Sequence, residues 1–163
     1  MQSSNGNSSP HKPGGYDAVV IGGGPAGSTA AAVLAMKGRR VAVLEKQRFP
    51  RYSVGESLLP YCYFPLERIG MIDKLRGSAF IKKYSVQFVS TKGKVSQPFY
   101  FFQHLDHPAS QTWQVVRADF DQMMLDNARE KGAEVFEGVA ARALLRDAEG
   151  RVCGVRADRY RYG

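Results

Sequence analysis

The sequence predicts an α/β fold, and three observations support this prediction. A short apolar run at 16–21 ends in glycines, which is typical of a buried parallel strand. The segment 26–37 is mostly Ala, Val, Leu and Met, and Gly38 follows it as a glycine commonly follows a helix. A second apolar run lies at 40–45. Strand, glycine turn, helix and strand make one βαβ unit, which opens a Rossmann-like, doubly wound sheet.

The next segment is predicted to depart from a plain βαβ series. A loop is expected over 46–56, and 57–70 is expected to be helical only in part because two prolines interrupt it. Apolar and polar residues alternate at 84–88, a turn follows at 91–94, and 95–102 returns, which predicts an inserted antiparallel hairpin. The aromatic residues that end the returning strand are expected to form the hairpin core.

A second helix and a third core strand are predicted further along the chain. Asp119 is a suitable helix cap, with Gln122 three residues later, and Gly132 ends the helical pattern. Four residues then share one helix face: Phe120, Met123, Met124 and Ala128. The run 133–136 reads as a strand.

A second hairpin is predicted at the C-terminal end, where 139–146 and 151–157 flank the turn 147–150. The expected organisation is a disordered tail over 1–15, followed by one α/β domain over 16–163. We expect that domain to be incomplete at its C-terminus.

Composition narrows the class of partner. The chain has 163 residues, 44% of them hydrophobic and 23% charged, which fits one globular domain. The formal charge is +8, yet Lys and Arg are spread along the chain without a basic run, so no nucleic-acid interface is predicted. The net positive charge favours anionic small molecules as partners.

The tail has no apolar signal-peptide core, and Cys62 and Cys153 lie far apart, which favours a cytoplasmic location. No membrane partner is expected, because glycines and a proline interrupt the apolar stretch 18–36.

The strongest motif is a glycine-rich turn between the first strand and the first helix. Gly22 permits the tight turn, Gly24 lets a pyrophosphate approach the backbone, and Gly27 lets the helix pack close to the strand. The helix N-terminus then offers N–H groups and a positive dipole end to phosphates. Glu45, at the end of the second strand, is placed to bind adenosine ribose hydroxyls. A ligand-free glycine turn is the alternative.

Three short motifs together resemble flavin-dependent halogenases. They are GGGPAGS at 22–28, FPR at 49–51 and GESLLP at 55–60. The set is most similar to the branch of that family that acts on phenols and pyrroles. Related flavoproteins that resemble geranylgeranyl reductases share the first two motifs but usually carry Cys-Gly-Gly in place of the GES. The resemblance extends over nearly everything after the tail.

This resemblance implies that the chain binds FAD. It suggests one set of cofactor-binding residues: Gly22, Gly24, Pro25, Ala26, Gly27, Ser28, Glu45, Lys46, Arg51, Ser57 and Arg117. Arg117 matches an Arg that precedes a helix in this superfamily and contacts the adenosine-diphosphate part of the cofactor. Its planar, paired donors suit a diphosphate. The alternative for Arg117 is a surface ion pair beside the helix.

A fourth motif, Phe80-x-x-Lys83-x-Ser85-x-x-Phe88, implies a catalytic lysine. It is similar to the halogenase stretch F-x-x-K-x-G-x-x-F, whose Lys lies between flavin and substrate, although Ser85 here replaces the commoner Gly. An amine there can hydrogen-bond hypohalous acid or become a haloamine. The alternative is an ordinary surface lysine beside Lys82.

The implied reaction uses reduced FAD from a separate flavin reductase, together with oxygen and a halide ion. Hypohalous acid forms, reaches Lys83, and halogenates an electron-rich aromatic substrate that is free or tethered to a carrier protein. No NAD(P)H site is predicted, because the chain has one dinucleotide motif. No metal site is predicted either, because His104 and His107 read as a polar loop.

Two alternatives remain open. The first is an FAD-dependent aromatic hydroxylase or reductase of the same superfamily. The second is a non-catalytic remnant, since the later Asp-Ala-Ser-Gly-like and Trp-x-Trp-x-Ile-Pro-like elements of the family are absent from this sequence. We therefore expect the chain to be a fragment that is inactive alone.

Overall fold

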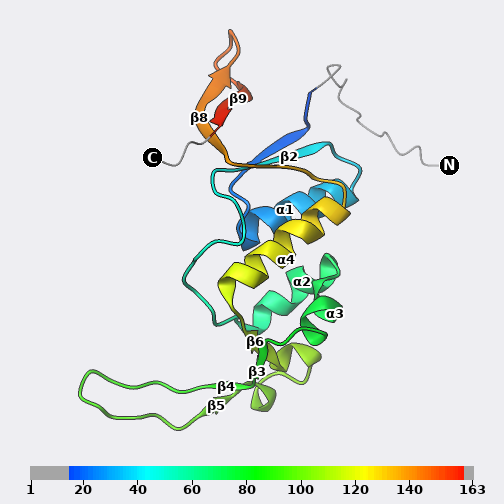
Figure 1. Cartoon of the computed structure of the whole chain (residues 1–163). Helices are drawn as coiled ribbons and strands as arrows, with labels where there is room; N and C mark the ends of the chain where they lie inside the picture. The colour runs from blue at the N-terminus through cyan, green and yellow to red at the C-terminus, as the bar shows by residue number, and fades with distance from the viewer. Residues whose placement is uncertain (1–14, 160–163) are drawn as a thin grey trace, which may run out of the picture.

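The computed structural model describes residues 15–159 (Figure 1). Its centre is a parallel sheet with strand order β1-β2-β7. These strands are β1 (Ala18–Ile21), β2 (Val41–Glu45) and β7 (Glu134–Glu137). Val43, in the middle strand, pairs with Val20 on one side and Val135 on the other. The predicted α/β sheet and its third strand are confirmed, with bounds shifted by one or two residues.

Two long helices pack against each other beside this sheet (Figure 1). Helix α1 (Pro25–Met36) connects β1 to β2, and α4 (Arg117–Glu130) precedes β7. Close packing is possible because α1 presents small side chains, with Ala31 and Ala32 fully buried. The side chains that α4 buries are Phe120, Asp121, Met124, Leu125, Asn127 and Ala128.

The segment with two prolines forms short helices that close the core below α4 (Figure 1). They are a 3₁₀ turn η1 (Pro60–Cys62), α2 (Tyr63–Arg68) and α3 (Met71–Arg76). Pro60 begins η1, where its missing N–H costs nothing. Ile69, Met71 and Leu75 are fully buried, so this region belongs to the same core as the parallel sheet. Partial helicity was predicted here, whereas α3 was not.

Two small antiparallel pairs lie next to these helices. The first joins β3 (Ile81–Lys83) to β6 (Thr112–Gln114), and the second joins β4 (Ser85–Val86) to β5 (Phe99–Tyr100). Two 3₁₀ turns separate β5 from β6, namely η2 (Phe101–Gln103) and η3 (Pro108–Ser110). The predicted first hairpin is present, but its paired strands are only two residues long each. It extends away from the helices as a long loop (Figure 1).

The predicted hairpin core is wrong in one respect. Of the four aromatic residues that begin at Phe99, only Phe101 is buried, because the chain turns there into η2. The large exposed hydrophobic residues of the hairpin are Tyr84, Phe88, Val89, Val95, Phe99, Tyr100 and Phe102. The hairpin therefore has no apolar core of its own.

The second hairpin is longer than predicted. Strand β8 (Val139–Arg146) pairs with β9 (Val152–Arg159) around the predicted turn, in which Asp147 accepts backbone N–H groups of Glu149 and Arg151. Its first strand contacts β2, the middle strand of the parallel sheet, so the hairpin is anchored to that sheet.

The predicted cap of the second long helix is also wrong. Helix α4 begins at Arg117, and its N-cap is Val116, which provides no side-chain cap. Asp119 lies in the first turn, where its charge complements the helix dipole. Gly132, at a φ of 102°, follows the helix as predicted.

The predicted tail over 1–15 and the end of the predicted domain at 163 fall mainly outside the described residues. Within residues 15–159, no helix has both the length and the apolar character needed to cross a membrane.

Candidate functional site: a basic glycine loop and a shielded lysine

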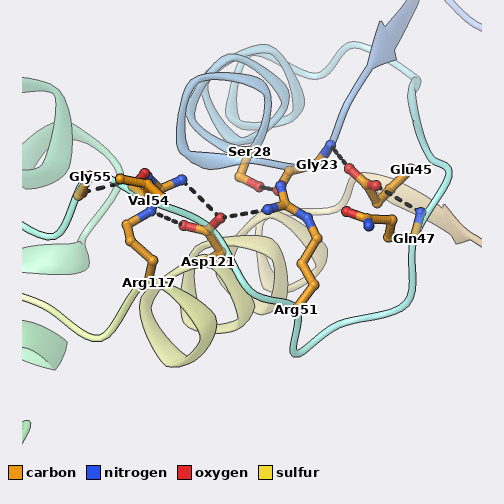
Figure 2. Close-up of polar contacts among 9 residues, drawn as sticks. All are labelled: Gly23, Ser28, Glu45, Gln47, Arg51, Val54, Gly55, Arg117 and Asp121. Atoms are coloured by element: carbon orange, nitrogen blue, oxygen red, sulfur yellow. Dashed lines mark hydrogen bonds and ion pairs between the residues drawn. The ribbon is translucent and has the colours of Figure 1, made fainter.

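The glycine-rich turn adopts the geometry that its sequence requires. Gly22 has a φ of 99°, a region that side chains disfavour, and its N–H donates to Leu44 O at 2.8 Å. A Cβ atom at Gly27 would lie 1.9 Å from Gly22 O, so only glycine lets α1 approach the turn this closely. The Ser28 hydroxyl donates to Gly23 O at 2.8 Å and ties the loop to the first helical turn. The loop is therefore held from both sides (Figure 2).

The N-terminus of α1 is open to an anion. Gly24 is its N-cap, no side chain caps it, and Pro25 fills the first position without an N–H. Ala26 follows with an exposed side chain. Since first-turn N–H groups carry the positive end of the helix dipole, they suit a phosphate.

Glu45, the last residue of β2, supports the glycine-rich loop. Its carboxylate is 4% exposed and accepts the backbone N–H groups of Gly23 and Gln47, each at 2.8 Å (Figure 2). It also borders a hollow of about 270 Å³ beside the loop. The other residues around this hollow are Ile21, Gly22, Leu44, Lys46, Val139, Ala140 and Ala141. Glu45 and Lys46 thus lie where an adenosine group could sit, and their binding role stays a prediction.

Two arginines converge on one buried carboxylate beside the loop (Figure 2). Arg117 donates Nε to Asp121 Oδ1 at 2.8 Å and Nη2 to Oδ2 at 3.0 Å. Arg51 approaches the same carboxylate at 3.4 Å, and Asp121 is fully buried. The hydrogen bonds that Asp121 accepts from Arg117 raise the pKa of Arg117 above its ordinary value. The charge of Glu56 also acts on Arg117, so the two arginines face two carboxylates, of which Asp121 is fully buried.

Arg117 also contacts the backbone at the start of the GES motif. Arg117 Nη1 donates to the backbone oxygen of Val54, and it lies 2.9 Å from where a Cβ of Gly55 would be. Gly55 has a φ of 107°, so both the backbone conformation and the space favour glycine there. The chain then pairs with β6 through Ser57 and Gln114, and Val115, which directly follows β6, donates its N–H to Glu56 O at 2.7 Å.

Lys83 lies at the end of β3 and is half-buried. Its Nζ donates to Ser57 Oγ at 2.5 Å and lies 5.5 Å from the centroid of the Phe101 ring. Burial lowers the pKa of Lys83 below its ordinary value. The structure therefore brings together two residues from separate motifs, Ser57 of GESLLP and the predicted catalytic lysine.

A larger hollow, of about 440 Å³, lies between the GES segment and the start of β3. Glu56 and Arg117 are its charged lining residues, and Tyr52 and Phe80 are its aromatic ones. Its walls are mostly apolar, which suits a flat organic group better than a free ion.

These residues fit the diphosphate of FAD. Arg51 lies beside the loop, with Nη2 3.4 Å from where a Cβ of Gly24 would be. Its Nε is buried and has no hydrogen-bond partner within 15–159. The Arg51 guanidinium, an uncapped helix N-terminus and a glycine surface meet at this place, and together they favour a phosphate group.

The structure places the predicted residues in two groups. The glycine loop, Glu45, Arg51 and Arg117 gather around α1, whereas Ser57 and Lys83 meet at β6. Sequence reasoning missed Asp121 and Phe101. The spacing of Arg117 and Asp121, four residues apart on one helix, is the signal that could have found Asp121. His107 accepts a backbone N–H from Ala109, and within 15–159 no cluster of three or more His, Cys, Asp or Glu residues is placed to hold a metal.

The fold and the loop define a dinucleotide-binding α/β domain. The sequence model for the FAD binding domain matches residues 15–160, and the chain belongs to that family.

Its relatives include flavin-dependent halogenases. Flavin-dependent halogenase armH3 of Armillaria mellea is 43% identical over 76% of this chain and 24% of its own length. The 1H-pyrrole-2-carbonyl-(peptidyl-carrier protein) chlorinase of Pseudomonas fluorescens is 38% identical over 76% of this chain and 31% of its own length. The solved structure of the myxobacterial chondrochloren halogenase CndH is 39% identical, with a TM-score of 0.80 over 87% of this chain and 32% of that one. The chain spans about a quarter of the length of most of the curated relatives it matches.

Proposed function

We propose that this chain is the FAD-binding portion of a flavin-dependent halogenase that acts on an electron-rich aromatic substrate. One observation carries the proposal: the Nζ atom of Lys83 donates to Ser57 Oγ of the GES segment at 2.5 Å, so two motifs of the halogenase resemblance meet. Reduced FAD, when bound, would supply hypohalous acid from oxygen and halide.

In this proposal, each group of residues has a separate role. The glycine loop and the two arginines would hold the diphosphate, because they present backbone N–H groups and guanidinium donors. Lys83 would hold the electrophile near the substrate, because an amine can hydrogen-bond hypohalous acid. Its partly buried position lowers the pKa of Lys83, which makes the neutral, nucleophilic amine more accessible.

The partners follow from the same proposal. We assign the supply of reduced flavin to a separate reductase, as the resemblance to flavin-dependent halogenases implies. The substrate would be a phenol or pyrrole, free or carrier-tethered, and the name of the P. fluorescens chlorinase supports the tethered form. The two free cysteines support a cytoplasmic location.

The test uses an extended protein, in which this chain is continued to the length of its relatives. It is supplied with FAD, a flavin reductase, oxygen and bromide or chloride, and the products from a phenol are separated by mass. A halogenated product that requires Lys83 supports the proposal, with Lys83→Met inactive and Lys82→Met active as the matched control. A hydroxylated product that forms equally well without halide contradicts the proposal and favours the hydroxylase alternative.

A further inference from the structure

The cofactor role of Ser57 stays a prediction, and the Ser57 hydroxyl accepts a hydrogen bond from Lys83. Strand β6 explains why the two meet. Ser57 pairs with Gln114 on one side of β6, and Lys83 pairs with Thr112 on the other. Since these β6 residues are two apart, Ser57 and Lys83 project from the same face of the small sheet. The long Lys83 side chain then reaches across β6 to Ser57 Oγ.

A second contact restrains the same ammonium group. The Lys83 Nζ atom lies over the ring of Phe101, which is only 6% exposed and is fixed by the turn η2. A lysine side chain has many rotamers, and a single contact rarely selects one. A hydroxyl and an aromatic face together restrain both the direction and the position of Nζ.

The chemical nature of the group that Lys83 contacts matters as much as its position. Lys83 makes no ion pair with a carboxylate within the described part of the chain, and burial alone lowers the pKa of its ammonium group. Glu56, the carboxylate next to Ser57 in the sequence, accepts the Gly55 N–H instead, and its charge acts on Arg117. A neutral hydroxyl orients an amine without holding its proton as a carboxylate would.

We propose that Ser57 is the positioning residue of Lys83: it holds the amine against Phe101 through a neutral hydrogen bond. The inference rests on the proposed function only for what Lys83 does next. The contact itself belongs to this chain and requires neither flavin nor halide.

The test measures the reactivity of individual lysines in the chain as it stands. A trace of acetic anhydride is added over a pH series, and mass spectrometry gives the acetylation of Lys83 relative to its neighbour Lys82. Ser57→Ala is expected to raise that ratio about threefold to tenfold at neutral pH, because an ammonium that loses a hydrogen-bond acceptor deprotonates more easily. Ser57→Thr keeps the hydroxyl and is expected to match the parent.

Phe101→Leu provides an independent variant, because it keeps apolar volume and removes the aromatic face. It is expected to raise the ratio in the same direction. Circular dichroism checks that each variant is folded. Phe101→Leu tests the contact with the ring, and Ser57→Ala compared with Ser57→Thr tests the hydrogen bond.

The proposal is overturned if folded Ser57→Ala leaves the ratio unchanged, or if Ser57→Thr behaves like Ser57→Ala. Its failure is distinguishable from failure of the proposed function. If the labelling behaves as expected but the extended protein makes no halogenated product, the positioning role stands and the halogenase proposal falls. If the extended protein halogenates but the labelling is unchanged, the halogenase proposal stands and the positioning role falls.

Discussion

Replacing Gly27 by Ala tests the close packing of α1 on the glycine turn. The added Cβ would lie 1.9 Å from Gly22 O, 3.1 Å from Gly22 C and 3.2 Å from a methyl carbon of Val20. Two of these atoms are backbone, so the helix itself must move. Overpacking of this kind costs about 3 kcal/mol. That loss lowers the melting temperature of a domain of this size by roughly 10 °C.

The measurement is urea and thermal unfolding followed by fluorescence of Trp113. It is the one tryptophan in the sequence and is 2% exposed, so its emission reports on the core. Gly24→Ala is the matched control, because its Cβ would meet only Arg51 Nη2 at 3.4 Å and its φ is −67°. We expect the free energy of unfolding of Gly24→Ala to stay within about 0.5 kcal/mol of that of the parent. Its FAD affinity should fall at least about tenfold. A Gly27→Ala protein as stable as the parent would refute the packing argument.

Three further substitutions test the cluster and the lysine. Asp121→Asn is expected to lower the free energy of unfolding, measured in urea, by about 3 kcal/mol, because two arginines lose the buried carboxylate that they share. Asp126 is half-exposed, so the control Asp126→Asn should lower it by less than about 1 kcal/mol. Gly55→Ala is expected to cost about 1–2 kcal/mol because of its positive φ, and an unchanged urea midpoint would contradict that backbone conformation. For Lys83, a lowered pKa means that the unfolded chain binds more protons than the folded chain between the lowered pKa and 10.5. Stability should therefore rise with pH in that window relative to Lys83→Met, and a difference between the two proteins that is independent of pH would exclude a shifted lysine.

The βαβ opening was predictable because its signals are local. Each boundary is marked by a residue with a special backbone, such as Pro25 at the helix start or Gly38 at its end, where φ is 75°. The cap at Asp119 was wrong because several residues at a helix start look equivalent in sequence. The choice of Arg117 as the first residue depends on its bonds to distant Val54 and to Asp121.

Strands β3 and β6 were missed for a different reason. Each is three residues long, which is too short to show a period of two, and their pairing joins segments about thirty residues apart. The same pairing brings Ser57 to Lys83, so the sequence could name both residues without showing that they touch. Phe101 looked like its aromatic neighbours, and only the 3₁₀ turn after β5 separates it from them.

The Lys83 contact lies at the root of the projecting β4–β5 hairpin. Lys83 comes just before β4, and Phe101 comes just after β5. Two short strands, one isolated bridge between Val89 and Val95, and exposed hydrogen bonds around Ser90 and Ser96 hold the hairpin together, and it lacks a core. Such a segment opens by local fluctuation without unfolding the rest of the domain. Backbone amides at the hairpin tip should then exchange hydrogen for deuterium quickly, and at similar rates in the parent and in Gly27→Ala. The surroundings of the Lys83 amine thus depend on the opening equilibrium of one hairpin, separately from the global stability of the domain.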